Sequence, residues 1–435
     1  MVTGTEGPVG PVAYPASDAA APTDQVSLRR HNLALVLRQV RDSGSRSRAR
    51  LATATGLNKA TVSSLVAERV DRGLLRDGGT ERRGVGRPGQ AVELDGTAVC
   101  GVGAEVNVDY LAAVALDLGG RVVSEQKIAM DITGLGADAV LDRLVRLVAE
   151  VLDDVAAAGG IPVGITVAVP GLVEASEGRV SLAPNLGWRE VPVVQSVRER
   201  LGGWSLPLLL DNEANLAAIA ELASSRASGR RDLLVLFGAT GVGGGIVANG
   251  QVLRGGRGFA GEVGHITVDP GGMRCGCGRI GCWETVVGLS ALMSQVADPD
   301  DPVRDPAMDL AERMTELRRR AELHDGRTLR ALQRLGSWLG TGAAMLVNVL
   351  NPEVLVLGGY FAELGPWLTD AVEQELAPRV VAAGTGGCRV ELSTLGFTAA
   401  ARGGAEVALD RVVSDPTLAD RAGVGGAPQP IGGVS

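Results

Sequence analysis

Apolar residues recur at helical spacing near the start of the chain, between residues 27 and 73. Within residues 27–43, one stripe consists of Leu33, Val36, Leu37 and Val40. This stripe predicts a first helix. Ser47 is placed to cap a short second helix that ends at Gly56, and Asn58 to cap a third helix. The inner face of that third helix is expected to carry Val62, Leu65, Val66 and Val70.

Two short helices joined by a three-residue turn that begins with Gly56 form the pattern of a helix-turn-helix. Such a motif lays the N-terminal residues of its second helix in the major groove of DNA. Short or polar side chains suit contacts with base edges and phosphates. The candidates are Asn58, Lys59, Thr61, Ser63 and Ser64.

Residues 74–94 predict two strands around a loop, which is the pattern of a wing. The loop carries Arg82, Arg83 and Arg87. The cationic tip Gly86-Arg87-Pro88 suits a narrow minor groove, where A·T tracts attract arginine, and a plain structural turn explains it equally well.

Beyond residue 94 the helical pattern gives way to alternating apolar strands. Segments 100–123 and 233–255 resemble each other, since each reads as an apolar strand, a turn with Gly, a second strand and a hairpin. Helical patterns follow at residues 137–158 and 328–350. Two unrelated hairpins are one explanation. We favour an α/β body of two similar lobes with a ligand cleft between them.

Composition and charge indicate that the head and the body have different roles. The 435 residues are 45% hydrophobic, which suits two or three folded domains. Residues 27–90 hold 14 Lys and Arg against five Asp and Glu, a balance of +9, whereas the rest of the chain has a balance of −17. A basic head on an acidic body favours nucleic-acid binding, although a solvated basic face has the same charge.

Three of the five cysteines lie within eight residues, at Cys275, Cys277 and Cys282. With His265 ten residues earlier, they provide the four ligands of a closed, structural Zn²⁺ site. Reduced, inert thiols are the alternative, and the many glycines between them argue against it, because a chain that wraps a metal needs backbone freedom. Two cysteines, Cys100 and Cys388, are left over.

Two carboxylates, Glu262 and Glu284, flank this loop. A loop fixed by metal would hold both near the cleft, where they can accept hydrogen bonds from sugar hydroxyls. Two ordinary surface carboxylates would have the same spacing.

From about residue 28 to residue 408 the chain resembles the ROK family of repressors, open reading frames and kinases. In the head, GLNKATVSSLV and GRPG resemble the family's transcriptional regulators. In the body, the matching segments are VPGLVE (169–174), APNLGW (183–188), LDNEANLAA (210–218), GATGVGGGIVANG (238–250), GEVGH (261–265), CGCGRIGCWE (275–284) and NPEVLVLGG (351–359).

The resemblance implies a two-lobed, actin-like (ribonuclease H-like) sugar-kinase body behind the winged head. It implies zinc on the histidine and the three cysteines named above. It also implies sugar contacts from Asn185, Asn212, Glu262, His265 and Glu284.

The chain departs from the family's kinases at two places. Their general base is the Asp of an Asn-Asp pair, and here Glu213 follows Asn212, so the carboxylate is displaced by about 1 Å and keeps only the ability to bind a hydroxyl. Their first phosphate loop reads Asp-x-Gly-Gly-Thr, whereas residues 103–107 read Gly-Ala-Glu-Val-Asn. Glu105 is expected to repel phosphate there. The second loop, residues 238–245, keeps its glycines, either for phosphate or as a structural turn.

These observations lead to four expected regions: an arm at 1–26, a winged helix-turn-helix at 27–93, a sugar-binding body at 94–410 and a flexible tail at 411–435. The expected function is a sugar-responsive transcriptional regulator, a repressor of carbohydrate genes without kinase activity. The alternative is an ATP-dependent sugar kinase. A sugar-binding structural protein would leave the basic head unexplained.

Operator DNA and a sugar or sugar phosphate are the expected partners, and the protein is expected to be a homodimer or homotetramer. No apolar run of about 18 residues and no leader pattern occurs in the sequence, so we expect a cytoplasmic protein without a membrane span.

Overall fold

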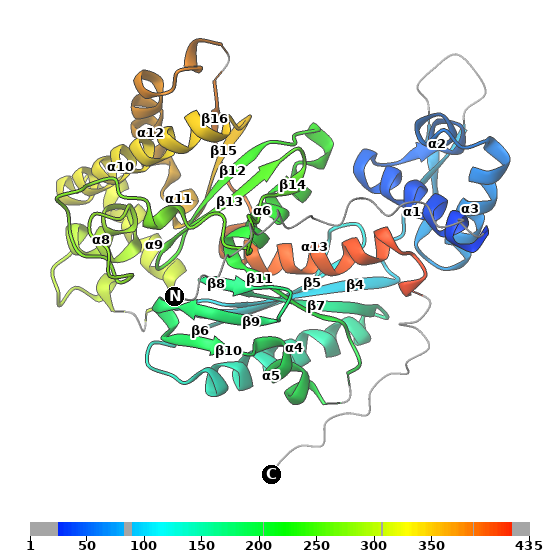
Figure 1. Ribbon diagram of the computed structural model, residues 1–435, viewed down its shortest axis with the longest axis horizontal. Helices are drawn as coiled ribbons and strands as arrows, with labels where there is room; N and C mark the ends of the chain where they lie inside the picture. Colours follow the sequence, from blue (N-terminus) through cyan, green and yellow to red (C-terminus); the bar gives the residue numbers. More distant parts are fainter. Residues whose placement is uncertain (1–24, 82–88, 203, 306–307, 386, 420–435) are drawn as a thin grey trace, which may run out of the picture.

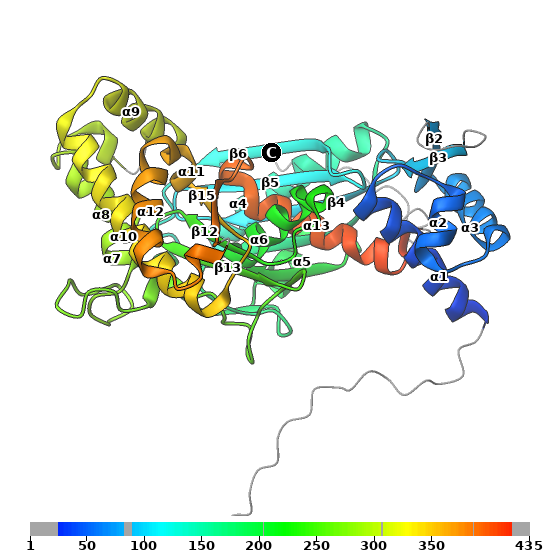
Figure 2. The same cartoon turned by 90° about the horizontal axis from the view of Figure 1, so that it is seen from above.

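The computed structural model describes residues 25–81, 89–202, 204–305, 308–385 and 387–419. It has three parts, a small head and two lobes that are each built on a five-stranded sheet (Figure 1). The last helix, α13 (Ala399–Ser414), lies between the lobes and runs toward the head, as Figure 2 also shows. The α/β class expected from the sequence is confirmed.

The head is a winged helix-turn-helix. Its elements are α1 (Gln25–Ser43), β1 (Arg46–Ser47), α2 (Arg48–Thr55), α3 (Lys59–Asp71), β2 (Leu75–Glu81) and β3 (Gly89–Leu94). Gly56 ends α2 in the left-handed conformation at φ 71°, and Asn58 Oδ1 accepts a hydrogen bond from the Thr61 amide at 2.8 Å. Both helix ends therefore lie where the sequence predicted them.

Two residues of α3 depart from the expected pattern. Val62, Leu65 and Val66 are buried as predicted, but Arg69 is fully buried and Val70 only half-buried. The apolar stripe failed to identify Arg69 because its partner, the Pro416 carbonyl, lies 347 residues away.

The first lobe contains the first of the two similar segments. Its sheet has the order β11-β7-β4-β5-β6, and α4 and α13 both pack on it, so that β4 and β5 are buried along their whole length. The elements are β4 (Val99–Val106), β5 (Tyr110–Asp117), β6 (Val122–Ala129), α4 (Ala137–Ala157), β7 (Ile161–Val169) and β11 (Leu208–Asn212). A small sheet beside it consists of β8 (Leu172–Glu174), β9 (Arg179–Ala183) and β10 (Trp188–Val191), with η1 (Pro184–Leu186) and α5 (Val193–Leu201).

The second lobe repeats this hairpin arrangement, which confirms the similarity seen in the sequence. Its sheet order is β14-β13-β12-β15-β16, with antiparallel β12, β13 and β14 and a parallel pair β12 and β15. The strands are β12 (Leu233–Gly238), β13 (Val242–Ala248), β14 (Gln251–Val252), β15 (Val354–Gly359) and β16 (Arg389–Leu392). The α-helices are α6 (Glu213–Ser224), α7 (Glu284–Val287), α8 (Leu289–Val296), α9 (Leu310–Glu322), α10 (Gly326–Leu350), α11 (Tyr360–Glu363) and α12 (Gly365–Arg379). Short 3₁₀ turns are η2 (Arg226–Ser228), η3 (Val263–His265), η4 (Pro302–Arg304), η5 (Ala383–Thr385) and η6 (Gly396–Thr398).

Glycine allows one helix to pack closely on each sheet. A Cβ at Gly103 of β4 would overlap the Ala401 carbonyl oxygen of α13, and a Cβ at Gly245 of β13 would overlap the Ala214 carbonyl oxygen of α6. These two glycines therefore serve helix packing rather than a phosphate.

Helix α13 connects the first lobe to the head. Hydrogen bonds link its C-terminal end and the residues that follow to the head helices: Arg41 to Asp410 at 2.9 Å, Arg38 to Ser414 at 3.3 Å, Arg30 to Asp415 at 3.5 Å and Arg69 to the Pro416 carbonyl at 3.2 Å. Val412 and Val413 are buried. The predicted start of a flexible tail at 411 is therefore wrong, because the helix continues through Ser414.

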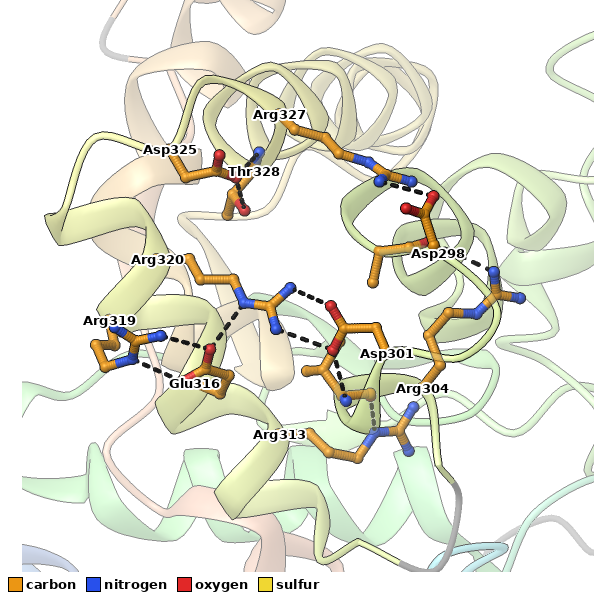
Figure 3. A network of polar contacts seen from close by, with 12 residues as sticks. Asp298, Asp301, Arg304, Arg313, Glu316, Arg319, Arg320, Asp325, Arg327 and Thr328 are labelled. Carbon is orange, nitrogen blue, oxygen red and sulfur yellow. Dashed lines mark hydrogen bonds and ion pairs between the residues drawn. The ribbon is translucent and has the colours of Figure 1, made fainter.

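A network of ion pairs holds the outer part of the second lobe together (Figure 3). Arg320 of α9 donates to both carboxylate oxygens of Asp301, at 2.8 and 2.9 Å, and to Glu316 at 2.8 Å. Arg313 of the same helix donates to the Val303 carbonyl at 2.9 Å. The network thus joins α9 to η4.

Among the described helices, none is long and apolar enough to span a membrane.

Candidate functional site

A cavity of about 470 Å³ lies where the two lobes meet. Its wall combines the turn after β4, the η1 segment, the start of α6, the turn between β12 and β13, and the cysteine loop. All six residues predicted to bind sugar line it: Asn185, Asn212, Glu213, Glu262, His265 and Glu284.

Asn212 is held by the start of α6. Its Oδ1 accepts hydrogen bonds from the Ala214 and Asn215 amides at 2.8 and 3.3 Å, and its Nδ2 donates to the Gly171 carbonyl at 3.0 Å. The side chain therefore caps the helix and has one N–H left for a ligand. The preceding Asp211 is occupied by Arg254 and Asn215.

Glu213 is a carboxyl group in an apolar and acidic environment. Its Oε2 is buried without a hydrogen-bond partner among the described residues. Burial, with the nearby charges of Glu262, Glu105 and Glu284, raises the pKa of Glu213 to about 8. The raised pKa favours the protonated form, which can donate a hydrogen bond to a hydroxyl oxygen.

Glu284 lies against the glycine-rich turn between β12 and β13. Its Oε2 accepts a hydrogen bond from the Val242 amide at 3.3 Å, and a Cβ at Gly241 would overlap the same oxygen. Gly241 is therefore needed for the close approach of the carboxylate. Glu262, which follows Gly261, also lines the cavity, and burial raises its pKa.

The histidine and the three cysteines come together as a potential metal site. Their ligand atoms all lie within 4.8 Å of one another, with 3.7 Å between His265 Nδ1 and Cys275 Sγ and 3.6 Å between Cys277 Sγ and Cys282 Sγ. Two sulfurs bound tetrahedrally at about 2.3 Å from Zn²⁺ lie about 3.8 Å apart. The cluster can hold a metal ion with little movement.

The cysteine loop is anchored on both sides of the cluster. Gly281 has φ 73°, and a Cβ there would overlap the Asp269 carbonyl oxygen, so this tight turn requires glycine. Trp283 is fully buried, and its Nε1 donates to the Trp338 carbonyl at 2.9 Å. Because Trp283 lies between Cys282 and Glu284, its burial fixes a potential metal ligand and a cavity carboxylate together.

The model of the ROK family matches residues 101–411, more than two thirds of the chain. The chain belongs to the ROK family. The xylose repressor of Bacillus subtilis (strain 168) is 28% identical over 395 residues, which cover 91% of this chain and 99% of that repressor. The glucokinase of Halalkalibacterium halodurans is 34% identical over 249 residues, which cover 56% of this chain and 74% of the kinase.

Solved structures agree on the fold. A ROK family transcriptional regulator, described as a homologue of the Escherichia coli MLC protein, superposes with a TM-score of 0.71 at 24% identity. The match covers 91% of this chain and 99% of that one. It confirms the expected fold, a winged head followed by the two-lobed body.

The first loop of this ROK protein differs from what the sequence suggested. Glu105 does not line the cavity but is fully buried in β4, where the Tyr110 hydroxyl lies 2.7 Å from its Oε1. Burial raises the pKa of Glu105 to about 7. The sequence predicted that Glu105 adds a charge that repels phosphate in this loop, and the structure instead places its side chain outside the cavity lining, beside Tyr110.

Sequence reasoning missed a contact between the lobes. Thr240, in the turn between β12 and β13, donates its hydroxyl to Asp109 Oδ2 at 2.8 Å, and Arg313 Nη1 lies 3.8 Å from Asp109 Oδ1. Asp109 follows the first loop, so the two hairpin turns meet here. The motif comparison considered the loops separately and so gave no signal of this contact.

The predicted DNA contacts lie together at the start of α3. Asn58, Lys59, Ser63 and Ser64 are exposed and Thr61 is half-buried. Asn58 uses its Oδ1 for the helix cap, which leaves its amide nitrogen for DNA. Arg82, Arg83 and Arg87 lie outside the described residues.

Proposed function

We propose that this ROK protein is a sugar-responsive, DNA-binding transcriptional regulator that represses carbohydrate genes. One observation carries the proposal: a winged helix-turn-helix and a cavity with all six candidate sugar ligands occur in one chain. Similarity to the B. subtilis xylose repressor over 91% of this chain supports it. Xylose and glucose, from the names of the relatives, are the first sugars to test.

In the proposed complex, the polar groups of the cavity bind sugar hydroxyls. Asn185 and Asn212 offer amide hydrogens, Glu262 and Glu284 accept, and the protonated Glu213 donates. The backbone amides of the glycine-rich turn complete the wall. His265 lines both this cavity and the potential metal site, so the metal loop and the bound sugar share a wall.

Helix α13 is the element through which sugar binding is proposed to act on the head. Near its N-terminal end, the Tyr110 hydroxyl bridges Glu105 and the Phe397 carbonyl, each at 2.7 Å. At its other end, Asp410 and Ser414 bond the head helix α1. A sugar that binds the two lobe arrangements with different affinity would shift α13, and with it the head.

We propose that the chain is not a sugar kinase. A kinase needs a base aligned with the attacked hydroxyl and free donors for phosphate. Here Glu213 stands where the family's kinases have an Asp, Thr240 bonds Asp109, and the Val242 amide bonds Glu284. These contacts leave the glycine-rich turn occupied by the protein's own carboxylates.

We propose Zn²⁺ for the site made by His265, Cys275, Cys277 and Cys282, a closed set of one imidazole and three thiols. The ion would supply a structural cross-link. The test is metal analysis of the purified protein and of Cys275→Ser. One zinc per chain and its loss in the variant are expected, and an unchanged metal content would contradict the assignment.

The proposed partners are operator DNA and a sugar, and the proposed assembly is a homodimer or homotetramer. A two-fold symmetric assembly would present two copies of α3 to a palindromic operator. A protein that binds chromosomal DNA works in the cytoplasm, which is the location we propose.

Two assays test the function. The first measures binding of the protein to DNA from upstream of its own gene, against unrelated DNA and over a range of salt. A preference of about 10³-fold or more is expected of a specific regulator. Equal binding to both DNAs would contradict the proposal. The second supplies ATP, Mg²⁺ and a panel of hexoses, for which no ADP above background is expected, and sustained turnover would establish the kinase instead.

A further inference from the structure

The glycine-rich turn of residues 238–243 has the sequence of a phosphate loop, but two of its donors already have acidic partners. The Thr240 hydroxyl donates to Asp109 at 2.8 Å. The Val242 amide donates to Glu284 at 3.3 Å. One carboxylate comes from the first lobe and the other from the end of the cysteine loop, so the turn is closed from two sides.

The cavity beside this turn is acidic. Glu213, Glu262 and Glu284 line it, and the buried Oε2 of Glu213 has no hydrogen-bond partner among the described residues. A wall with three acidic side chains disfavours the negative charge of a phosphate dianion.

Few cationic groups lie near the cavity among the described residues. Arg313 is almost fully buried and faces Asp109 at 3.8 Å. His265 belongs to the potential metal site. Arg279 lines the cavity from the exposed part of the cysteine loop and lies outside the glycine-rich turn.

We infer that the cavity selects uncharged sugars over their phosphate esters, and that Asp109 is the residue that closes the glycine-rich turn to phosphate. The inference rests on the proposed sugar-binding function and names the chemical class of its ligand. A phosphate that approached the turn would have to displace Asp109 from Thr240 while facing the carboxylates of the cavity.

The test is calorimetric titration of the full-length, metal-loaded protein. The probes are D-xylose, D-glucose, xylose 5-phosphate, glucose 6-phosphate and glucose 1-phosphate. At least one neutral sugar is expected to bind, and each of its esters at least about 30-fold more weakly, which corresponds to about 2 kcal/mol. Esters that bind as tightly as the neutral sugar would overturn the inference and leave the sugar-sensing function intact. Failure of both classes to bind would overturn the proposed function, and the inference with it.

Asp109→Asn tests the residue itself. The amide can still accept from Thr240, so the affinity for the neutral sugar should stay within about twofold. The loss of one negative charge near the turn should lower the ratio of neutral-sugar affinity to ester affinity by roughly tenfold. Asp138→Asn, which removes an exposed acid from α4 in the same lobe, is the matched control and should change neither value. If the affinity ratio in Asp109→Asn equals that of the unmodified protein, Asp109 does not exclude phosphate from the turn. If the variant fails to fold, the titration of the unmodified protein still decides the ligand class.

Discussion

The two lobes carry the same hairpin arrangement, and the residues at the two turns have different environments. In the first lobe the strand before the turn carries a buried acid, Glu105, as its next-to-last residue, bonded to Tyr110. In the second lobe the turn keeps its glycines and approaches Glu284, and the next-to-last residue of the strand before it is the buried, apolar Phe237. Each sheet has a glycine where a helix crosses it, at Gly103 of β4 and Gly245 of β13. The packing glycines are thus present in both lobes, whereas the open phosphate-binding geometry is present in neither.

The largest expected effect comes from these packing glycines. Gly103→Ala should lower the free energy of unfolding by about 3 kcal/mol or more, because the new methyl group overlaps the α13 backbone. Gly245→Ala should cost somewhat less, since its overlap with α6 is less severe. Chemical denaturation at fixed pH measures both.

Gly256→Ala is the control, because a Cβ at this position meets nothing within 4 Å. Its stability should match that of the unmodified protein. If Gly103→Ala were as stable as this control, the close packing of α13 on β4 would be wrong.

Glu105 should make stability depend on pH. Its pKa is raised by burial to about 7, above its value in the unfolded chain, so the folded state binds the proton more tightly. Its contribution is fully present below the unfolded pKa and is lost as pH rises through about 7, with a slope of at most about 1.4 kcal/mol per pH unit.

Glu105→Gln mimics the protonated acid and should flatten this slope between pH 5.5 and 7.5. Thermal unfolding across that range is the measurement. A variant with the same slope as the unmodified protein would show that Glu105 is not held neutral. The Tyr110 hydroxyl has one hydrogen but lies beside two acceptors, Glu105 and the Phe397 carbonyl. When Glu105 is protonated it can donate to the Tyr110 oxygen, so that the Tyr110 hydrogen is free for the Phe397 carbonyl.

Thr240→Val should have a moderate effect at the point where the two turns meet. The change leaves Asp109 Oδ2 without the Thr240 hydroxyl and should cost about 1–2 kcal/mol. Because this contact joins the lobes, the affinity for a neutral sugar should also fall several-fold. Thr240→Ser retains the hydroxyl and should recover most of both losses, and a serine variant as weak as the valine variant would contradict the account.

The smallest effect on stability, but a specific one on function, is expected at the head. Asp410→Ala with Ser414→Ala removes two contacts of α13 with α1 and should cost less than about 1 kcal/mol, since both residues are exposed. Sugar affinity should be unchanged, whereas the change in DNA affinity on sugar binding should shrink several-fold. Asp138→Asn again serves as the control, and a double variant with the full sugar response would exclude this route between cavity and head.

Local patterns in the sequence were sufficient for much of this fold. The caps at Gly56 and Asn58, the apolar stripes and the repeated hairpins depend on neighbours within a few residues, and the structure confirms them. The cysteine cluster could be predicted from its spacing, and the cavity residues from the resemblance of their segments to the ROK family.

The remaining features depend on contacts between distant parts of the chain. Asp109 and Thr240 lie 131 residues apart, and Arg69 meets the Pro416 carbonyl across 347 residues. No pattern in either segment identifies its partner. Glu105 was assigned to phosphate repulsion for the same reason, because its burial depends on Tyr110 and on the end of α13 folding over it.

The central claim is that one chain couples sugar binding to DNA binding without catalysis. The most direct measurement is a titration of labelled upstream DNA with the full-length protein, followed by fluorescence anisotropy with and without a sugar that calorimetry shows to bind. The account predicts a change in DNA affinity of about tenfold or more, equal to a coupling free energy of about 1.4 kcal/mol. An unchanged DNA affinity at saturating sugar would contradict it.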